Sequence, residues 1–153
     1  MNGLENTWGS KIATTNWKIG ELDIETARYS PIKEVYNYEI NNPSTSSGEI
    51  TYEAKIGLMY FSDYRYAASP DYWTTTLFEE RASDWMYLGI NEWTISRRVE
   101  RIANVFILYS DYGGSVYYGN VIYALAVRPV FYLNSNVQYI SGSGTQSDPF
   151  RIA

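Results

Sequence analysis

The chain has 153 residues and a net charge of −5, and it contains neither cysteine nor histidine. These absences remove disulfide bonds, the commonest general base and the usual nucleophile pairs, and the acidity argues against a nucleic-acid or anionic-lipid partner. Hydrophobic residues make up 45% and charged residues 19%, which indicates a globular chain, and the length fits one domain over residues 1–153.

The first fifty residues predict short elements. Residues 16–20 are expected to form a short strand that ends at a glycine. Residues 21–29 fit one or two helical turns before Pro31, which marks a boundary. Residues 32–40 alternate imperfectly and fit either a strand or a short helix. Residues 41–49 are all turn formers and predict a loop.

The middle of the chain predicts one strand and one helix. Residues 50–61 are expected to form the strand, in which Gly57 marks a bulge or a close backbone approach, and the next three residues end it. Ser69 as N-cap and Pro70 as first helical residue predict a helix that runs as far as Gly89.

Strands dominate the prediction from residue 92 onward, and the apolar runs among them are expected to form the core. The expected strands are residues 92–96, 103–109 and 121–127, and residues 130–133 are expected either to continue the last of these or to form a separate strand. Pro129 cannot donate to a ladder, so it is expected at a strand edge or a bulge. Arg128 before it must be extended, and its guanidinium is expected to pair with a carboxylate or with carbonyl groups.

The chain closes with two short apolar runs around a Gly/Ser/Asp-Pro turn, at residues 137–140 and 150–152, which predict a terminal hairpin. The whole pattern predicts an α+β fold with a mixed, mainly antiparallel sheet and one or two helices. No segment approaches the roughly 20 apolar residues that span a bilayer, and the start lacks a signal-peptide pattern. We therefore expect no membrane insertion.

The sequence contains few residues in patterns that enzymes use for catalysis. Residues 113–117 approach a nucleophile-elbow pattern but carry Tyr117 where the last glycine is required, and no histidine could serve the serine. Glu79, Glu80 and Asp84 could supply a carboxylate pair for glycoside hydrolysis, but their helical spacing favours a solvated face. We therefore predict no catalytic residue.

A metal site is also disfavoured. Asp63, Asp111 and Asp148 lie in expected loops, where carboxylates could meet a calcium ion. None of them belongs to a run with calcium-ligand spacing, so calcium is the less favoured alternative. We predict no metal and no cofactor.

The sharpest candidate site is the tyrosine-rich stretch from residue 109 to residue 123. Tyrosine is the main compositional signal of the chain, with 16 residues, and mixed Tyr/Ser/Gly/Asn composition is typical of binding loops. We expect a loop at residues 110–120, with its turn at Gly113 and Gly114. The alternative is an ordinary hairpin with tyrosines in cross-strand pairs. The predicted ligand-binding residues are Tyr109, Asp111, Tyr112, Tyr117, Tyr118, Asn120 and Arg97.

Three arginines form a small basic cluster beside this stretch. Arg97, Arg98 and Arg101 lie close in sequence to Glu92 and Glu100. Ion pairing at the surface is the favoured interpretation. The alternative is a rim that contacts an anionic ligand, and Arg97 is included among the site residues on that alternative.

Ordered blocks in the chain resemble a family of bacterial surface and pilin-associated proteins, many of them from gut Firmicutes. The blocks are residues 55–69 (KIGLMYFSDYRYAAS), 93–96 (WTIS), 127–133 (VRPVFYL) and 141–150 (SGSGTQSDPF). The resemblance covers about residues 50–153. The chain lacks the cysteines that several family members carry near the helical region, and it has no Glu-Pro-Asn or Trp-Asn-Asp calcium-lectin motif.

The resemblance implies a C-type-lectin-like fold and extracellular or cell-surface localisation. On it we expect a surface-displayed, non-catalytic binding or adhesion module whose partner is a protein or a glycan. The alternative is a structural subunit of a pilus-like appendage, with other appendage subunits as partners and no ligand site.

Overall fold

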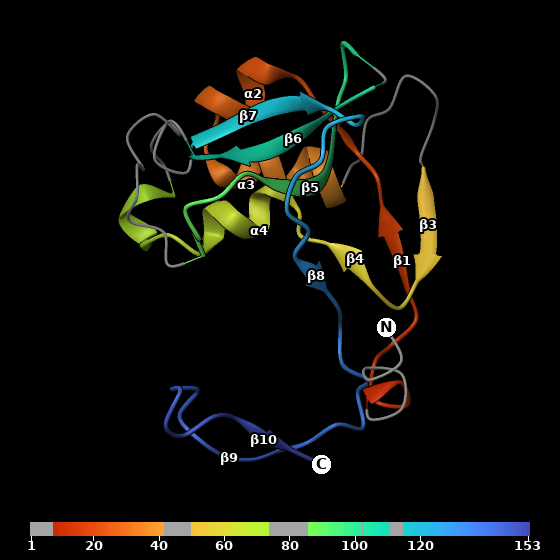
Figure 1. Ribbon diagram of the computed structural model, residues 1–153, viewed down its shortest axis with the longest axis vertical. Helices are drawn as coiled ribbons and strands as arrows, with labels where there is room; N and C mark the ends of the chain where they lie inside the picture. Colours follow the sequence, from red (N-terminus) through yellow and green to blue (C-terminus); the bar gives the residue numbers. More distant parts are fainter. Residues whose placement is uncertain (1–7, 42–49, 74–85, 102, 111–114) are drawn as a thin grey trace.

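The computed structural model describes residues 8–41, 50–73, 86–101, 103–110 and 115–153. Short helices cover one face of a small sheet, and a long C-terminal segment leads away from this body to a separate hairpin (Figure 1). Helices and mostly antiparallel strands are mixed in one chain, so the predicted α+β class is confirmed, but the described residues hold three α-helices where one or two were expected. No helix in these five ranges is long and apolar enough to cross a membrane.

The body is organised around a four-stranded sheet of order β2-β5-β6-β7. Its strands are β2 (Glu21–Leu22), β5 (Glu92–Arg98), β6 (Asn104–Tyr109) and β7 (Ser115–Asn120). The β5-β6 and β6-β7 pairs are antiparallel, whereas β2 runs parallel to β5. The expected strands at residues 92–96 and 103–109 are therefore confirmed.

Strand β5 is central because both of its edges are paired. One edge pairs with β6. On the other edge, Trp93 N–H donates to the carbonyl of Ala126 at 3.0 Å, and Ile95 N–H donates to the carbonyl of Met59 at 3.0 Å. Strand β2 pairs with the C-terminal end of the same edge. Three segments that are far apart in sequence are thus held together on one strand.

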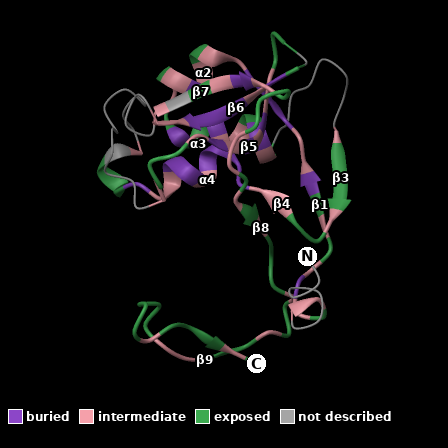
Figure 2. Cartoon of the chain, viewed as in Figure 1, coloured by how far each residue is buried: buried purple, intermediate pink, exposed green. Residues whose placement is uncertain are grey.

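The helices pack against one face of this sheet. They are α2 (Ile24–Tyr29), α3 (Ile32–Tyr36) with the π-helical η1 (Asn37–Asn41), and α4 (Phe61–Tyr66). Figure 2 shows the buried residues gathered where α3 and α4 meet the sheet. The rings of Phe61 and Phe106 stack there with centroids 6.0 Å apart. The buried cluster comprises Leu22, Ala27, Ile32, Val35, Met59, Phe61, Tyr64, Phe106 and Leu108.

Helix α2 follows the predicted helical turns of residues 21–29. Asp23 caps it, because its carboxylate accepts hydrogen bonds from Thr26 N–H at 2.7 Å and from the Thr26 hydroxyl at 2.5 Å. For residues 32–40, where strand and helix were both open, the structure has a helix. Its inward residues Ile32 and Val35 are three positions apart, which is helical spacing.

The predicted strand at residues 50–61 is wrong in its length. The chain forms β3 (Thr51–Ala54), which pairs with β1 (Thr15–Lys18), and then β4 (Gly57–Leu58), which pairs with β8 (Pro129–Val130). Helix α4 begins where this strand was expected to end. The expected short strand near residue 16 is confirmed as β1.

Two local interactions explain this division. A Cβ on Gly57 would lie 2.6 Å from the Trp17 ring, so the close approach expected at Gly57 is confirmed. The Trp17 Nε1–H donates to the carbonyl of Ala54 at 3.0 Å, which fixes the ring over the bend between β3 and β4. Asp63 then accepts from Tyr60 N–H at 2.9 Å, and this bond starts α4.

The largest correction concerns residues 115–127. Residues 115–120, expected within a loop, form strand β7 and pair with β6 along its full length, from Tyr109↔Ser115 to Asn104↔Asn120. Residues 121–127, expected as a core strand, belong to no strand, and Ile122 is 81% exposed. The physical reason is that β6 has a free edge, that Ser115–Asn120 is the nearer of the two segments to it in sequence, and that aromatic residues suit an edge strand.

The predictions for residues 129–133 and for the helix from Ser69 are confirmed only in part. Pro129 lies in the two-residue strand β8, so its edge position is confirmed, whereas the expected strand at residues 130–133 is too long. Pro70 is the first residue of the 3-10 helix η2 (Pro70–Tyr72), and Ser69 makes no side-chain cap there. The rest of that predicted helix, with Glu79, Glu80 and Asp84, falls largely outside the described residues.

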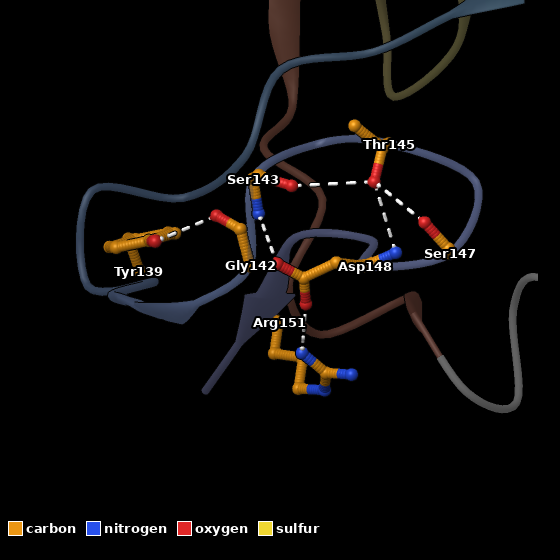
Figure 3. A network of polar contacts seen from close by, with 7 residues as sticks. All are labelled: Tyr139, Gly142, Ser143, Thr145, Ser147, Asp148 and Arg151. Atoms are coloured by element: carbon orange, nitrogen blue, oxygen red, sulfur yellow. Dashed lines mark hydrogen bonds and ion pairs between the residues drawn. The ribbon is translucent and has the colours of Figure 1, made fainter.

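The terminal hairpin is confirmed as β9 (Tyr139–Ser141) paired with β10 (Arg151–Ile152). Figure 3 shows how its turn is held: Asp148 accepts from Ser143 N–H at 2.9 Å and from Arg151 Nη1 at 3.0 Å. Gly142 has φ +105°, a conformation that favours glycine. The hairpin is therefore a defined element, although it lies apart from the sheet (Figure 1).

Candidate functional site

A pocket of about 540 Å³ lies over strands β6 and β7. Its walls come from these strands, from the ends of β5 and β6, and from the segment that follows β7. The lining residues are Asn91, Arg101, Asn104, Ile107, Tyr109, Tyr117, Tyr118, Gly119, Asn120, Tyr123 and Leu125. The volume is in the range of small-molecule sites.

The segment of residues 121–128, called here the crossing segment, makes one wall of this pocket. It leaves β7 through a turn in which Tyr123 N–H donates to the carbonyl of Asn120 at 3.0 Å. It then passes over β6 to the far edge of β5, where Ala126 N–H donates to the carbonyl of Asn91 at 3.0 Å (Figure 1). This path turns Tyr123 and Leu125 toward the pocket.

The structure brings together four of the predicted site residues. Tyr109, Tyr117, Tyr118 and Asn120 all line the pocket. The predicted residues Asp111 and Tyr112 lie outside the described part of the chain.

The structure places the predicted site residue Arg97 at another position. Arg97 does not line the pocket, because its guanidinium lies 2.8 Å from the Glu21 carboxylate, across the pairing of β5 with β2.

Tyr117 and Tyr118 belong to a stack of four side chains. Their rings are stacked with centroids 4.6 Å apart, the Arg98 guanidinium lies 3.8 Å from the Tyr118 ring, and the Arg28 guanidinium lies 5.6 Å from the Tyr117 ring. Tyr109 contacts Tyr117 at 5.6 Å as a diagonal cross-strand neighbour. The cross-strand alternative is thus confirmed for this pair, alongside the pocket.

This stack decides how the two tyrosines can meet a ligand. Because the ring faces are covered by guanidinium groups and by each other, sugar or aliphatic groups cannot stack on them. The hydroxyl groups and ring edges are what the pocket presents. The neighbouring Arg98 guanidinium lowers the pKa of the Tyr118 hydroxyl, which makes it a better hydrogen-bond donor.

The three arginines of the basic cluster have different roles. Arg97 pairs with Glu21, and Arg98 Nε lies 2.6 Å from the Glu100 carboxylate, so ion pairing is confirmed for these two. Arg101 lines the pocket and has no acidic partner among the residues described. The anion-contacting alternative stays a prediction, and Arg101 is the member of the cluster whose position fits it.

Two asparagines give the pocket oriented amides. Asn91 Oδ1 accepts from Ser110 N–H at 2.7 Å, and Asn120 Oδ1 accepts from Ile122 N–H at 3.1 Å. With each carbonyl oxygen bonded to backbone, the Nδ2 groups remain as donors. Sequence reasoning did not name Asn91, Asn104 or Leu125, and it included Tyr123 in the tyrosine-rich stretch without naming it as a site residue. The crossing segment, which brings Tyr123 and Leu125 to the pocket, was not predicted.

No carboxylate lines the pocket among the residues that the structure describes. A glycosidase needs two carboxyl groups on either side of the scissile bond, and the described wall supplies none. The described ranges also hold no cluster of three or more acidic residues placed to bind a metal. The described wall supplies hydrogen-bond donors and one positive charge.

Glu39 is a notable buried carboxylate away from this pocket. It is fully buried in η1, where it accepts from Ser62 N–H at 2.9 Å and from the Ser96 hydroxyl. Burial raises the pKa of Glu39 to about 7, although these hydrogen bonds act to lower it. Glu39 ties η1 to α4 and β5, so it belongs to the interior rather than to a site.

A second, apolar pocket of about 440 Å³ lies beside the terminal hairpin. It is lined by Trp8, Phe131, Leu133, Tyr139, Phe150 and Ile152. Tyr139 and Phe150 are both 65% exposed, and their rings meet edge to face at 6.0 Å. This surface offers apolar contact without charge.

Comparison of the chain with protein-family models, with curated proteins and with solved structures found no match.

Proposed function

We propose that this protein is a non-catalytic binding module, displayed at the cell surface, that takes its ligand in the pocket over β6 and β7. The ligand belongs to a glycan or protein partner outside the cell, and nucleic acid is not a partner. We propose with it the finer fold assignment, a C-type-lectin-like domain of the bacterial surface family that residues 50–153 resemble. The α+β organisation is compatible with that assignment.

The observation that carries the proposal is the composition of the pocket wall. Tyrosine hydroxyls, asparagine amides and one guanidinium converge on one hollow, and the apolar surface beneath them comes from Ile107 and Leu125. Polar groups in fixed positions over a small apolar floor are typical of ligand sites. The oriented amides of Asn91 and Asn120 provide directional donors without any ligand-induced ordering.

The same wall supports a non-catalytic role. Histidine and cysteine are absent from the sequence, and the described pocket wall holds no carboxylate. Histidine, cysteine and carboxylates are the groups that most often serve as general acids, general bases and nucleophiles in enzymes.

A binding screen on arrays of surface glycans and secreted proteins tests the proposal. The test variant is the double change Tyr117→Phe with Tyr118→Phe, which keeps the stacked rings and removes the two hydroxyls from the pocket. The control is Tyr52→Phe on β3, an exposed tyrosine outside the pocket. We expect a ligand whose affinity falls about tenfold or more in the double variant and is unchanged in the control.

Two results would contradict the proposal. A ligand bound equally by the double variant and the wild type would place the site elsewhere. Failure of the folded protein to bind any member of either array would count against a binding module.

A second candidate function rests on the terminal hairpin. The apolar pocket beside it and the exposed rings of Tyr139 and Phe150 form a contact surface away from the body. A two-stranded hairpin is marginal alone, and covering its apolar side chains would stabilise it. These features favour a structural subunit of a surface appendage as the alternative.

Sedimentation velocity distinguishes this candidate from the first. An appendage subunit predicts concentration-dependent assembly that is lost when Tyr139 and Phe150 are both changed to Ser. A wild-type protein that stays monomeric up to millimolar concentration would refute it.

A further inference from the structure

We infer that the pocket over β6 and β7 binds an acidic saccharide, a short chain of sugar rings that carries a carboxylate, with Arg101 as the contact for that carboxylate. The inference rests on the proposed function and names its ligand class. It is carried by the distribution of charge in the pocket, by the kind of donors there, and by the pocket's length.

The charge in the pocket is opposite to that of the chain. The protein has 17 acidic and 12 basic residues, yet Arg101 is the one charged side chain among the described residues that line the pocket. The nearby Glu100 carboxylate is already bound, at 2.6 Å from Arg98 Nε. An anionic group in the pocket would therefore meet a guanidinium that no described acid neutralises, and a planar guanidinium can hold a carboxylate with two hydrogen bonds.

The neutral groups suit a ring with many hydroxyls. Tyrosine hydroxyls can donate and accept, and the Nδ2 groups of Asn91 and Asn120 donate. Sugar hydroxyls also donate and accept, so each can pair with such a group. Ile107 and Leu125 supply apolar contact for the C–H surface of a ring, because the faces of Tyr117 and Tyr118 are already covered.

The pocket is long enough for more than one ring. Its wall follows β6 from Asn104 to Tyr109. At about 3.3 Å for each residue, this stretch is roughly 16 Å long. Arg101 lies at the Asn104 end and Asn91 at the Tyr109 end, where it bonds to Ser110. A ligand can thus place its carboxylate at one end and neutral hydroxyls along the rest.

Titration calorimetry with matched pairs of oligosaccharides tests this inference. The acidic members are an oligogalacturonate, a hyaluronan tetrasaccharide and sialyllactose, and each neutral member is the same saccharide with its carboxyl groups reduced to alcohols. A polyglutamate peptide serves as an anion without sugar rings. The variants are Arg101→Gln at the pocket and Arg151→Gln in the terminal hairpin, which removes the same charge far from it.

We expect at least one acidic saccharide to bind, with at least tenfold weaker binding of its reduced partner and of polyglutamate. Arg101→Gln should weaken binding of that acidic saccharide by about 10- to 100-fold, and Arg151→Gln should leave it unchanged. Higher salt should weaken the wild-type interaction and have little effect on the Arg101→Gln variant.

The acidic-saccharide inference and the proposed binding function are contradicted by different results. Neutral members that bind as well as acidic ones, with affinity lost in the Tyr117→Phe, Tyr118→Phe variant, would overturn the acidic-saccharide inference and keep the binding module. Polyglutamate that binds as well as the saccharides, or an Arg101→Gln variant that binds as well as the wild type, would likewise overturn the inference. Absence of binding by every saccharide would overturn the inference, and a protein ligand found on the arrays would then keep the module.

Discussion

Arg128 and Glu92 form a two-point ion pair that fastens the end of the crossing segment to the first residue of β5. Arg128 Nε donates to Glu92 Oε1 at 3.2 Å, and Nη2 donates to Oε2. The same Nη2 donates to the carbonyl of Met86 at 2.7 Å. The expectation that Arg128 pairs with a carboxylate or with carbonyl groups is confirmed, since it does both, and the pair fixes one end of the pocket wall.

Changing Arg128 to Ala should destabilise the fold strongly. Glu92 is 2% exposed, so the change leaves a buried carboxylate without its counter-ion, at a cost of about 3 kcal/mol in the free energy of unfolding. Urea denaturation measures this cost. The double variant Arg128→Met with Glu92→Gln should lose less than Arg128→Ala alone, and an equal or larger loss would contradict the account.

The stability of the protein should fall as the pH rises toward neutrality because of Glu39. Burial raises the pKa of Glu39 to about 7 in the folded state, above its ordinary value of 4.5. The protonated form is favoured in the folded chain, so this contribution is fully present below about pH 4.5 and is lost as the pH rises through 7. Burial also raises the pKa of Asp63, whose contribution has the same sign. The loss attributable to Glu39 is on the order of 3 kcal/mol.

Glu39→Gln is the matched test of this pH dependence. Glutamine keeps the shape and an acceptor for Ser62 N–H, but it does not titrate. Chemical denaturation at intervals from pH 4.5 to pH 8.5 should show a wild-type slope that is much reduced in the variant. Parallel pH profiles for the two proteins would assign the titration to another group.

Much of this architecture can be predicted from the sequence, and the elements that cannot be predicted have physical reasons. The short strand before Gly20, the apolar run of β6 and the terminal hairpin follow from local pattern and turn residues alone. The strand at β5 is also predicted, but its inward face is polar: Thr94 donates to the carbonyl of Phe106 at 2.7 Å, and Ser96 donates to Glu39. Periodicity cannot indicate such a face, because its partners come from distant segments.

Two segments after Tyr109 were predicted wrongly for a related reason: the expected loop contains a strand, and the expected strand does not form. Residues 115–120 and 121–127 are both rich in strand formers, and a sequence does not say which of them takes the free edge of β6. Ser115 lies opposite Tyr109, so the segment nearer in sequence occupies the free edge and the farther one is left exposed. Four of the predicted site residues, all tyrosine or asparagine, line one pocket in the structure, whereas the sequence did not indicate that the crossing segment forms one of its walls.

Gly57→Ala should destabilise the protein, although alanine is ordinarily tolerated in strands. The new Cβ would lie 2.6 Å from the buried Trp17 ring, and shifting that ring costs about 1–3 kcal/mol. Thermal unfolding should show a lower midpoint. Gly119→Ala is the control, because its Cβ would meet Trp93 and Ile107 at an ordinary 3.4 Å. A midpoint for Gly57→Ala that matches this control would contradict the packing described here.

Ala variants of Tyr123 and Ile122, two neighbours in the crossing segment, test whether this segment contributes to ligand binding. Tyr123 is 58% exposed and lines the pocket, whereas Ile122 is 81% exposed and does not. Either change to Ala should alter the free energy of unfolding by no more than about 0.5 kcal/mol. Tyr123→Ala alone should weaken ligand binding in calorimetry. Equal binding by the two variants would remove the crossing segment from the site.

The central claim is that a ligand binds over β6 and β7 and not at the terminal hairpin. Backbone amide chemical shifts of the ¹⁵N-labelled protein, followed during titration with the acidic saccharides, test it most directly. The account predicts shifts at Arg101, Asn104, Tyr118, Gly119, Asn120 and Tyr123, with residues 139–152 unchanged. Shifts confined to residues 139–152, around Tyr139 and Phe150, would contradict it.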